Sequence, residues 1–291
     1  MGSRPDLVSD RPFMSPNVEF AKLWEPGISG VELFSAQLFQ HSFGKHFHET
    51  YTIGMNDGGQ GSFLYRGETC CAYSGSFNLI NPGEVHTGAA ESEKGWQFRD
   101  IYISVAQVQQ ILNQLEWRDR ELPCFVTPVI WDAALQQLFH ALFQALSVPT
   151  FQLEQESLLL EFMSQLFLRH AEPRYAVRSL KSETRAVTRV RAYLEAHYTE
   201  NISMDELAQL AGLSPYYLIR SFHQQVGLPP HSYQRHWQLL QAKRSLRTPM
   251  SLSEVAIAHG FYDQSHLNRY FKRAFGITPG QYRESNSVQD R

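Results

Sequence analysis

Hydrophobic and polar residues follow two different periods along this chain of 291 residues. From Val18 to about Ser104, short apolar runs such as VELFSAQLF, YTIGM and FRDIYIS alternate with polar, glycine-containing clusters such as NDGGQG and NPGE. Runs of this length without a helical period are typical of antiparallel strands joined by tight turns. We therefore predict an antiparallel β-barrel or sandwich over 18–104.

After Ser104 the period changes to that of amphipathic helices. Apolar residues recur every three or four positions in 107–117, 131–146 and 153–169, which indicates one buried face on each helix. Only the sequence SVPT interrupts the last two, so they predict an antiparallel hairpin within a helical region over 105–170. Its apolar stripe must pack either on the β-domain or on a second subunit.

Two segments have no periodic face at all. Residues 1–17 are polar and broken by prolines, and residues 171–184 contain a proline and five charged residues. Segments with so little apolar surface do not pack into a core. We predict a flexible tail and a linker, which leave an N-terminal domain over 18–170 and a C-terminal domain over 185–285.

The C-terminal domain is helical in pattern and contains an internal repeat. The segment AGLSPYYLIRSFHQQVGLPPHSYQ (211–234) aligns with HGFYDQSHLNRYFKRAFGITPGQYR (259–283), with one residue inserted in the second turn. Identical residues lie forty-nine positions apart at Leu218 and Leu267, Arg220 and Arg269, Phe222 and Phe271, Gly227 and Gly276, Pro230 and Pro279, and Tyr233 and Tyr282. Each copy consists of a short helix, a glycine turn and a second helix, which predicts two helix–turn–helix units.

The helix starts carry matching signals in both copies. Ser203 and Ser251 are each followed three residues later by a glutamate, which is the arrangement of a capping box. The second helices have caps of their own, Ser214 in one copy and Asp263 in the other. These caps fix where each predicted helix begins.

The second helix of each unit leaves one face free of apolar core residues. Guanidinium, amide, hydroxyl and apolar groups on that face can read base edges. We predict base contacts from Tyr216, Tyr217, Ile219, Arg220, Gln264, Ser265, His266, Asn268 and Arg269. We predict phosphate contacts from Lys243, Arg244, Lys272 and Arg273.

The distribution of charge agrees with a nucleic-acid partner for one end of the chain. The net charge is −3, yet residues 185–285 carry twelve Lys/Arg against seven Asp/Glu, and the rest carries fourteen against twenty-two. A basic domain attached to an acidic one indicates that the C-terminal domain alone binds double-stranded DNA.

The C-terminal segment from about Asn201 to Tyr282 resembles the AraC/XylS family of bacterial transcription regulators. The resemblance lies in DELAQLAGLSPYYLIRSF and in EVAIAHGFYDQSHLNRYFKRAFGITPGQYR. It implies seven helices, a long connecting helix at about 232–247, and two reading helices in successive major grooves about 34 Å apart. It also implies RNA polymerase as a partner. Ile219 departs from the polar residue often found there, which favours apolar contact with a base.

The N-terminal half resembles the cupin-like ligand-binding domain that many of these regulators carry. The matching pieces are HFHETYTIG, FLYRGE and NPGEVHTG. The resemblance implies a small-molecule effector in the barrel and dimerisation through the helices. The expected fold class is therefore α+β multidomain: a cupin-like antiparallel β-barrel with a helical hairpin, followed by an all-α double helix–turn–helix domain.

Three histidines, His46, His48 and His86, are the candidates for metal chemistry. In metal-binding cupins, HxH is followed three or four residues later by a glutamate, but here that position falls on Thr52 or Ile53. Three neutral imidazoles can still hold Zn²⁺ or Fe²⁺. Without the carboxylate, we favour a polar pocket wall over a metal site. The chain has no G-x-S-x-G or HExxH motif that would support catalysis.

Histidine, aromatic and cationic side chains together predict an effector pocket. Its expected wall is His46, His48, Tyr51, His86, Trp96 and Arg99. These side chains offer hydrogen-bond donors, flat apolar faces and one cation, which suits a small polar or anionic effector.

These observations predict a transcription activator that is a homodimer, is not an enzyme and uses no cofactor. Three cysteines, an odd number, favour a reducing compartment, and we expect the cytoplasm. Two alternatives stay open: a metal-dependent cupin enzyme fused to a DNA-binding module, and a dimerising regulator without an effector.

Overall fold

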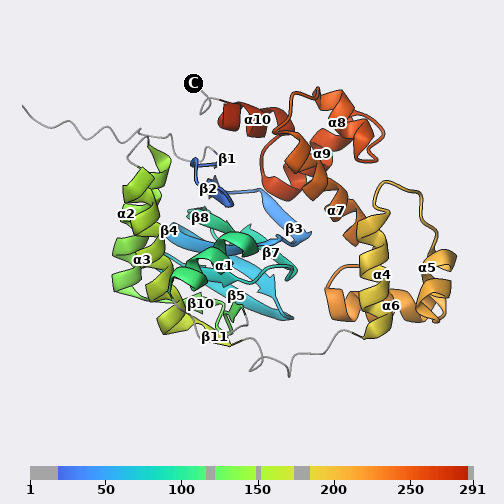
Figure 1. The fold of residues 1–291 in the computed structure, drawn as a ribbon, viewed down its shortest axis with the longest axis horizontal. Helices are drawn as coiled ribbons and strands as arrows, with labels where there is room; N and C mark the ends of the chain where they lie inside the picture. The colour runs from blue at the N-terminus through green and yellow to red at the C-terminus, as the bar shows by residue number, and fades with distance from the viewer. Residues whose placement is uncertain (1–18, 116–121, 149–151, 174–183, 288–291) are drawn as a thin grey trace, which may run out of the picture.

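The computed structural model describes residues 19–115, 122–148, 152–173 and 184–287 (Figure 1). They form an N-terminal sheet domain and a C-terminal helical domain. The predicted tail and residues 174–183 of the predicted linker lie outside the described residues. The linker residues Glu172–Pro173 form strand β11, which pairs with β9 (Pro123–Cys124).

The N-terminal domain is built on a nine-stranded antiparallel sheet. Its strands are β1 (Phe20–Trp24), β2 (Val31–Leu38), β3 (Ser42–His46), β4 (Thr50–Tyr65), β5 (Glu68–Tyr73), β6 (Phe77–Ile80), β7 (His86–Ala90), β8 (Trp96–Ser104) and β10 (Val129–Ile130). The first half of β4 pairs with β6 and β8, and its second half pairs with β5 and β7. This pairing confirms the predicted antiparallel fold with one difference: no ladder among the described residues closes the sheet, so it is open rather than a complete barrel.

Alternation along the strands separates two cores on opposite faces of the sheet. Leu33, Ile53 and Ile101 belong to the core on one face, together with residues of the helices α1, α2 and α3. Phe34 and Phe98 belong to the other core, which continues into the C-terminal domain.

The helical region follows the predicted periods closely. It consists of α1 (Val105–Gln114), α2 (Ala133–Ser147) and α3 (Gln152–His170). Phe139 of α2 packs edge-on against Phe162 of α3 and Phe77 of β6. The apolar stripe of the hairpin therefore packs on the β-domain of the same chain, which was the first of the two predicted possibilities.

The C-terminal domain has seven helices in its described residues, as the family resemblance implies. They are α4 (Arg185–Ala196), α5 (Met204–Ala211), α6 (Pro215–Val226), α7 (Pro230–Ser245), α8 (Leu252–Ala258), α9 (Gln264–Phe275) and α10 (Pro279–Ser287). The predicted connecting helix is α7, and α5–α6 and α8–α9 are the two helix–turn–helix units. Across all described residues, no helix combines the length and the apolar character needed to cross a membrane.

The predicted caps are present, and one differs in detail. Ser214 and Asp263 cap α6 and α9 through their side chains. Ser251 and its glutamate form a complete capping box at α8. At α5 only the serine half forms, because the carboxylate of Glu206 accepts a hydrogen bond from the hydroxyl of Tyr193 instead.

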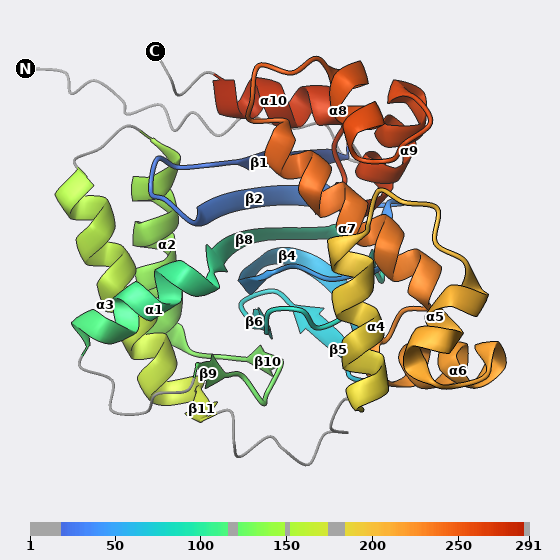
Figure 2. The same ribbon diagram turned by 45° about the vertical axis from the view of Figure 1, so that its right-hand side comes forward.

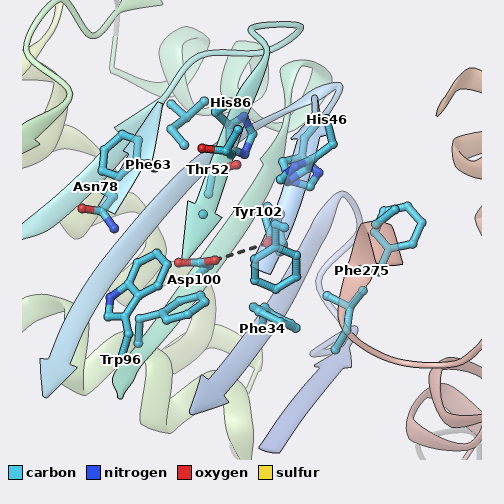
Figure 3. A pocket seen from close by; sticks show the side chains of 18 of the residues that line it. Phe34, His46, Thr52, Phe63, Asn78, His86, Trp96, Asp100, Tyr102 and Phe275 are labelled. Atoms are coloured by element: carbon cyan, nitrogen blue, oxygen red, sulfur yellow. Dashed lines mark hydrogen bonds between the residues drawn. The ribbon is translucent and has the colours of Figure 1, made fainter. Parts of the chain in front are cut away.

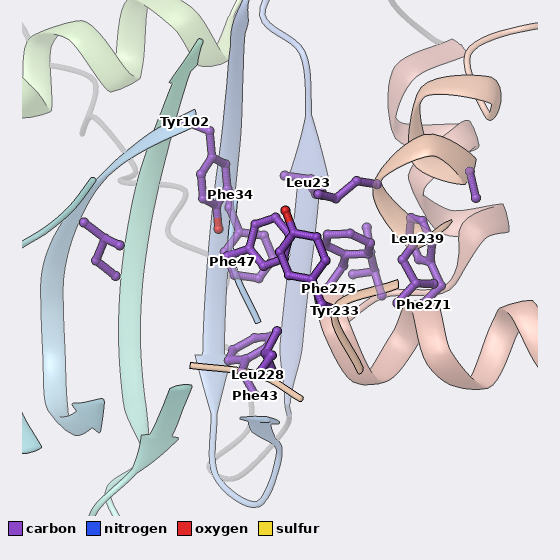
Figure 4. Close-up of a cluster of buried hydrophobic side chains, with 14 of the residues drawn as sticks. Leu23, Phe34, Phe43, Phe47, Tyr102, Leu228, Tyr233, Leu239, Phe271 and Phe275 are labelled. Atoms are coloured by element: carbon purple, nitrogen blue, oxygen red, sulfur yellow. The ribbon is translucent and has the colours of Figure 1, made fainter. Parts of the chain in front are cut away.

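The two domains pack directly against each other. Helices α2 and α3 lie on one side of the sheet, and α7, α9 and α10 lie on the other (Figures 1 and 2). Between them, Phe47 stacks on Tyr233 of α7 with ring centroids 5.0 Å apart, and Phe43, Leu228 and Phe275 join the same cluster (Figure 4). The interface is thus a continuous apolar core that buries side chains from both domains.

Candidate functional site

A pocket opens on the face of the sheet that is turned toward the C-terminal domain (Figure 3). It encloses about 640 Å³ of space free of protein atoms, its open mouth included. Most of the wall comes from the sheet, but Lys243 of α7 and Ala274 and Phe275 of α9 complete it. A ligand in this pocket would therefore contact both domains.

Strand alternation decides which predicted residues reach the pocket. His46, His48, His86 and Trp96 line it. Tyr51 and Arg99 do not, because each is an odd number of residues from a pocket-facing residue on its strand, Thr52 or Trp96, and neighbours on a strand point to opposite faces.

The two misplaced residues have structural roles on the other face. The Tyr51 hydroxyl donates to the carbonyl oxygen of Pro123 over 2.7 Å. Arg99 pairs with Asp57 at 2.7 Å, and its guanidinium lies 4.9 Å from the ring centre of Phe143 in α2. The prediction of these two as pocket residues is therefore corrected: Tyr51 ties the sheet to β9, and Arg99 contacts the helix α2.

Trp96 forms a fixed end wall of the pocket. Its indole Nε1 donates to Oδ1 of Asn56 over 2.8 Å, and Asn56 exchanges hydrogen bonds with Asn78 at 3.1 and 3.2 Å. The ring lies against Gly61, where an added Cβ would fall 2.2 Å from it. The wall thus combines a flat apolar surface with an amide edge whose orientation is set by a buried network.

Asp100 places a carboxyl group inside the pocket. It is buried, it accepts a hydrogen bond from the Tyr102 hydroxyl over 3.2 Å, and the missing side chain of Gly54 leaves room for it. Burial raises the pKa of Asp100 to about 7, because desolvation disfavours the charged form. The carboxyl is therefore near half-protonation at neutral pH and can donate as well as accept.

His46, His48 and His86 come together at one side of the pocket. The ring centroid of His46 lies 4.9 Å from that of His48 and 4.3 Å from that of His86. Burial lowers the pKa of His46 to about 4 and lowers the pKa values of His48 and His86 well below their ordinary range. All three are neutral imidazoles at physiological pH, the form that binds metal ions.

Lys243 differs from its predicted role. Its ammonium lies 2.7 Å from the Glu32 carboxylate of β2, and the two side chains are only 12% and 13% exposed. Arg244 pairs with Glu49 at 2.6 Å across the same interface, although it is 56% exposed. In this arrangement both residues face the N-terminal domain rather than a DNA phosphate, because acidic side chains of the sheet domain are their nearest partners.

The reading helices expose about half of the residues assigned to bases. Tyr217, Ile219, Arg220, Ser265 and Arg269 are exposed, as are Lys272 and Arg273. The Tyr216 side chain lies outside what the structure describes.

The other three assigned residues of α9 are half-buried. Gln264 accepts from the Ser253 hydroxyl over 3.1 Å, and the Nδ1 atom of His266 accepts from the backbone N–H of Tyr262 over 3.2 Å. Asn268 has a buried side-chain oxygen with no hydrogen-bond partner among the described residues. Gln264 and His266 thus hold the turn between α8 and α9 in this structure.

Sequence reasoning missed several pocket residues, among them the polar residues Thr52, Asn78, Asp100 and Tyr102. The sequence did indicate two of them. Asp100 and Tyr102 are an even number of residues from Trp96 on the same strand, so their side chains must lie on the same face. Thr52 and Asn78 lie on other strands, whose register with β8 no sequence pattern specifies.

Comparison with known proteins agrees with this architecture. The family model of the AraC-like ligand binding domain matches residues 29–163, and that of a helix-turn-helix domain matches residues 207–285. An uncharacterized HTH-type transcriptional regulator YbfI of Bacillus subtilis (strain 168) is 29% identical over 81% of this chain and 86% of its own. The HTH-type transcriptional activator RhaS of Klebsiella pneumoniae (strain 342) is 26% identical over 91% and 96%.

A solved structure shares the whole two-domain fold. The crystal structure of an apo variant of ToxT from Vibrio cholerae strain SCE256 superimposes with a TM-score of 0.57 at 12% identity, over 89% of this chain and 98% of that one. The two family models, which together span most of the chain, agree with the double helix–turn–helix and the pocket described above. The chain belongs to the AraC family of transcriptional regulators, with an N-terminal ligand-binding domain and a C-terminal helix–turn–helix domain that binds DNA.

Proposed function

We propose that this chain activates transcription in response to a small polar or anionic effector bound between its two domains. The observation that carries this proposal is the shared pocket wall, to which the DNA-binding domain contributes Lys243 and Phe275. A ligand in this pocket favours the domain arrangement that binds it more tightly. It shifts the equilibrium between two arrangements by the difference between its binding free energies for them. The activator RhaS of Klebsiella pneumoniae, a relative that covers 91% of this chain, supports activation as the output.

The interdomain ion pair supplies a route from effector to DNA-binding domain. Lys243 lines the pocket and at the same time pairs with Glu32. An anionic group on the effector would compete with Glu32 for this ammonium, so that occupancy changes the contact between the domains. A thermal-shift survey of polar and anionic metabolites tests this step, and a survey in which no compound stabilises the protein would favour a regulator without an effector.

The proposed DNA contacts come from the exposed faces of α6 and α9. Arg269 is exposed on α9 and is suited to bidentate contact with guanine. In a titration with DNA fragments selected by the protein from a random pool, Arg269→Ala should weaken specific binding by about 1–3 kcal/mol and relax selectivity at one position. Lys272→Ala is the matched comparison, since loss of a phosphate contact should weaken binding to all sequences alike and reduce the salt dependence. Unchanged binding by Arg269→Ala would show that α9 is not the reading helix.

The remaining parts of the proposal concern assembly and location. We expect a homodimer formed through the α2–α3 hairpin, as the resemblance to the family's ligand-binding domain implies. We also propose that the protein contacts RNA polymerase, acts in the cytoplasm where promoter DNA is found, and is not an enzyme. Sedimentation analysis of the full chain tests the dimer.

A further inference from the structure

The three pocket histidines are brought together by strand pairing, not by chance on a surface. His46 of β3 and His86 of β7 are directly opposite each other in the antiparallel ladder, and His48 follows two residues later along the chain. One ring nitrogen from each of the three lies within 4.8 Å of one from each of the others. Figure 3 shows His46 and His86 on neighbouring strands at the edge of the same pocket.

Two of the three rings are held in the tautomer that a metal site requires. Nδ1 of His46 lies 2.8 Å from the carbonyl oxygen of Gly44, and Nδ1 of His86 lies 3.0 Å from that of Glu84. A carbonyl oxygen can only accept, so each Nδ1 carries the hydrogen and each Nε2 keeps a free lone pair. Metal-binding histidines in proteins are oriented by this same hydrogen bond from the other ring nitrogen.

From this geometry we infer that His46, His48 and His86 bind one divalent transition-metal ion of the zinc class inside the effector pocket, which deepens the proposed function by naming the chemistry of the sensing site. Three imidazoles suit Zn²⁺, Cu²⁺, Fe²⁺ or Ni²⁺ rather than Mg²⁺ or Ca²⁺, which prefer oxygen ligands. A tetrahedral ion with bonds of about 2.0–2.1 Å requires nitrogens closer than 4.8 Å, so binding would draw the three rings together.

Three protein ligands leave a fourth coordination position for water or for a donor atom of the effector. The hydroxyl of Thr52 lies in the same pocket wall, is buried, and has no hydrogen-bond partner among the described residues. The missing cupin glutamate therefore does not exclude a metal, because three imidazoles with one open position are a known ligand set for zinc.

The cluster is linked to the DNA-binding domain through the residue between two of its ligands. Phe47 stacks on Tyr233 of α7 with an interplanar angle of 15°, and its carbonyl oxygen accepts a hydrogen bond from Nε2 of His236 over 2.6 Å. In the segment 46–48, His46 and His48 thus belong to the histidine cluster, and Phe47 between them contacts α7. A metal that draws His46 and His48 together acts directly on this contact with the helix that connects the two helix–turn–helix units.

Metal binding by the full-length protein tests the inference. After removal of metal with a chelator, Co²⁺ should bind with a stoichiometry of one per chain, produce visible absorption bands typical of low coordination, and be displaced by Zn²⁺. His46→Gln and His86→Gln should each weaken Co²⁺ binding by at least about 100-fold, beyond the 10–100-fold that loss of a supporting group costs. His231→Gln, a change at an exposed histidine of α7, is the matched control and should bind as the wild type does.

Two results would overturn the inference: a wild-type protein that binds no Co²⁺, or His46→Gln and His231→Gln variants that bind it equally. Circular dichroism of each variant shows whether it is folded, so loss of binding in a folded variant is informative. The DNA titration is separate, using fragments selected from a random pool with and without Zn²⁺. If no fragment is selected under either condition, the proposed regulatory function fails while the metal site stands. A Zn²⁺-bound protein with unchanged DNA affinity would overturn the link through Phe47.

Discussion

Replacing Glu32 with glutamine removes the charge from the ion pair between the domains while nearly preserving its shape. Glu32 pairs with Lys243 at 2.7 Å and Arg247 at 3.1 Å, and it accepts from the Tyr282 hydroxyl over 2.8 Å. Two opposite charges about 3 Å apart attract by about 5 kcal/mol at an effective dielectric constant of about 20. Removing one partner of a buried pair costs about 3–5 kcal/mol, because the other charge stays buried without compensation.

We expect the lower end of that range, since Glu25 still pairs with Arg247 in the variant. A loss of about 3 kcal/mol corresponds to roughly a 100-fold shift of the docking equilibrium toward separated domains. Hydrogen exchange of peptides covering 42–48 and 228–237 reports this shift directly, because these segments meet at the interface, and small-angle scattering reports the accompanying expansion.

The matched control is Glu49→Gln, which removes a different and more exposed interdomain ion pair. Its partner Arg244 is 56% exposed, and exposed pairs contribute about 0–1 kcal/mol because water and salt screen them. We therefore expect nearly unchanged exchange in this variant. Equal effects of the two substitutions, or wild-type exchange in Glu32→Gln, would refute the argument that burial makes the Glu32–Lys243 pair the main electrostatic contact between the domains.

Two further predictions concern the pocket and the helix caps. Burial raises the pKa of Asp100 from its ordinary 3.8 to about 7. Between these two pH values the folded state therefore binds a proton more tightly than the unfolded state does. The stability of the wild type consequently falls as the pH rises from about 4 to about 7. The side chain of the Asp100→Asn variant does not titrate. The free energy of unfolding of this variant should therefore exceed that of the wild type by about 4 kcal/mol at pH 8 and match it near pH 4. Urea titrations at several pH values measure both free energies, and a difference that does not depend on pH would contradict the prediction. Ser251→Ala removes the hydroxyl that accepts from the Glu254 N–H over 3.2 Å and should cost about 1 kcal/mol of stability by the same assay, whereas an unchanged midpoint would mean that this capping box contributes nothing.

The helical domain was largely predictable because its signals are local. A cap such as Ser214 or Asp263 acts on backbone groups only three residues away, so its meaning is contained in a short stretch of sequence. The repeat reinforces these signals by presenting them twice. The same locality explains why the capping box at α5 was predicted wrongly, since the hydrogen bond from Tyr193 to Glu206 joins two helices and cannot be read from the spacing in either.

The pocket was less predictable because it depends on register and on docking. Trp96 and Arg99 were assigned to the same wall, although strand geometry alone places them on opposite faces. Lys243 was assigned to a DNA phosphate because its ion pair could not be recognised in the sequence. Its partner Glu32 is 211 residues away, and no local pattern connects a charge on a helix with one on a distant strand. Sequence reasoning therefore identified both domains but could not indicate that they share a site.

That shared site has a consequence for engineering. Regulators are commonly redirected by exchanging one DNA-binding module for another, on the assumption that each module is a self-contained part. In this chain Lys243, Ala274 and Phe275 belong to the module that would be exchanged, yet they also line the pocket in which we propose that the effector binds. A chimera would inherit new side chains at those positions and with them a different chemical preference. With the effector bound as proposed, effector selectivity and promoter choice would not be separable traits of this protein.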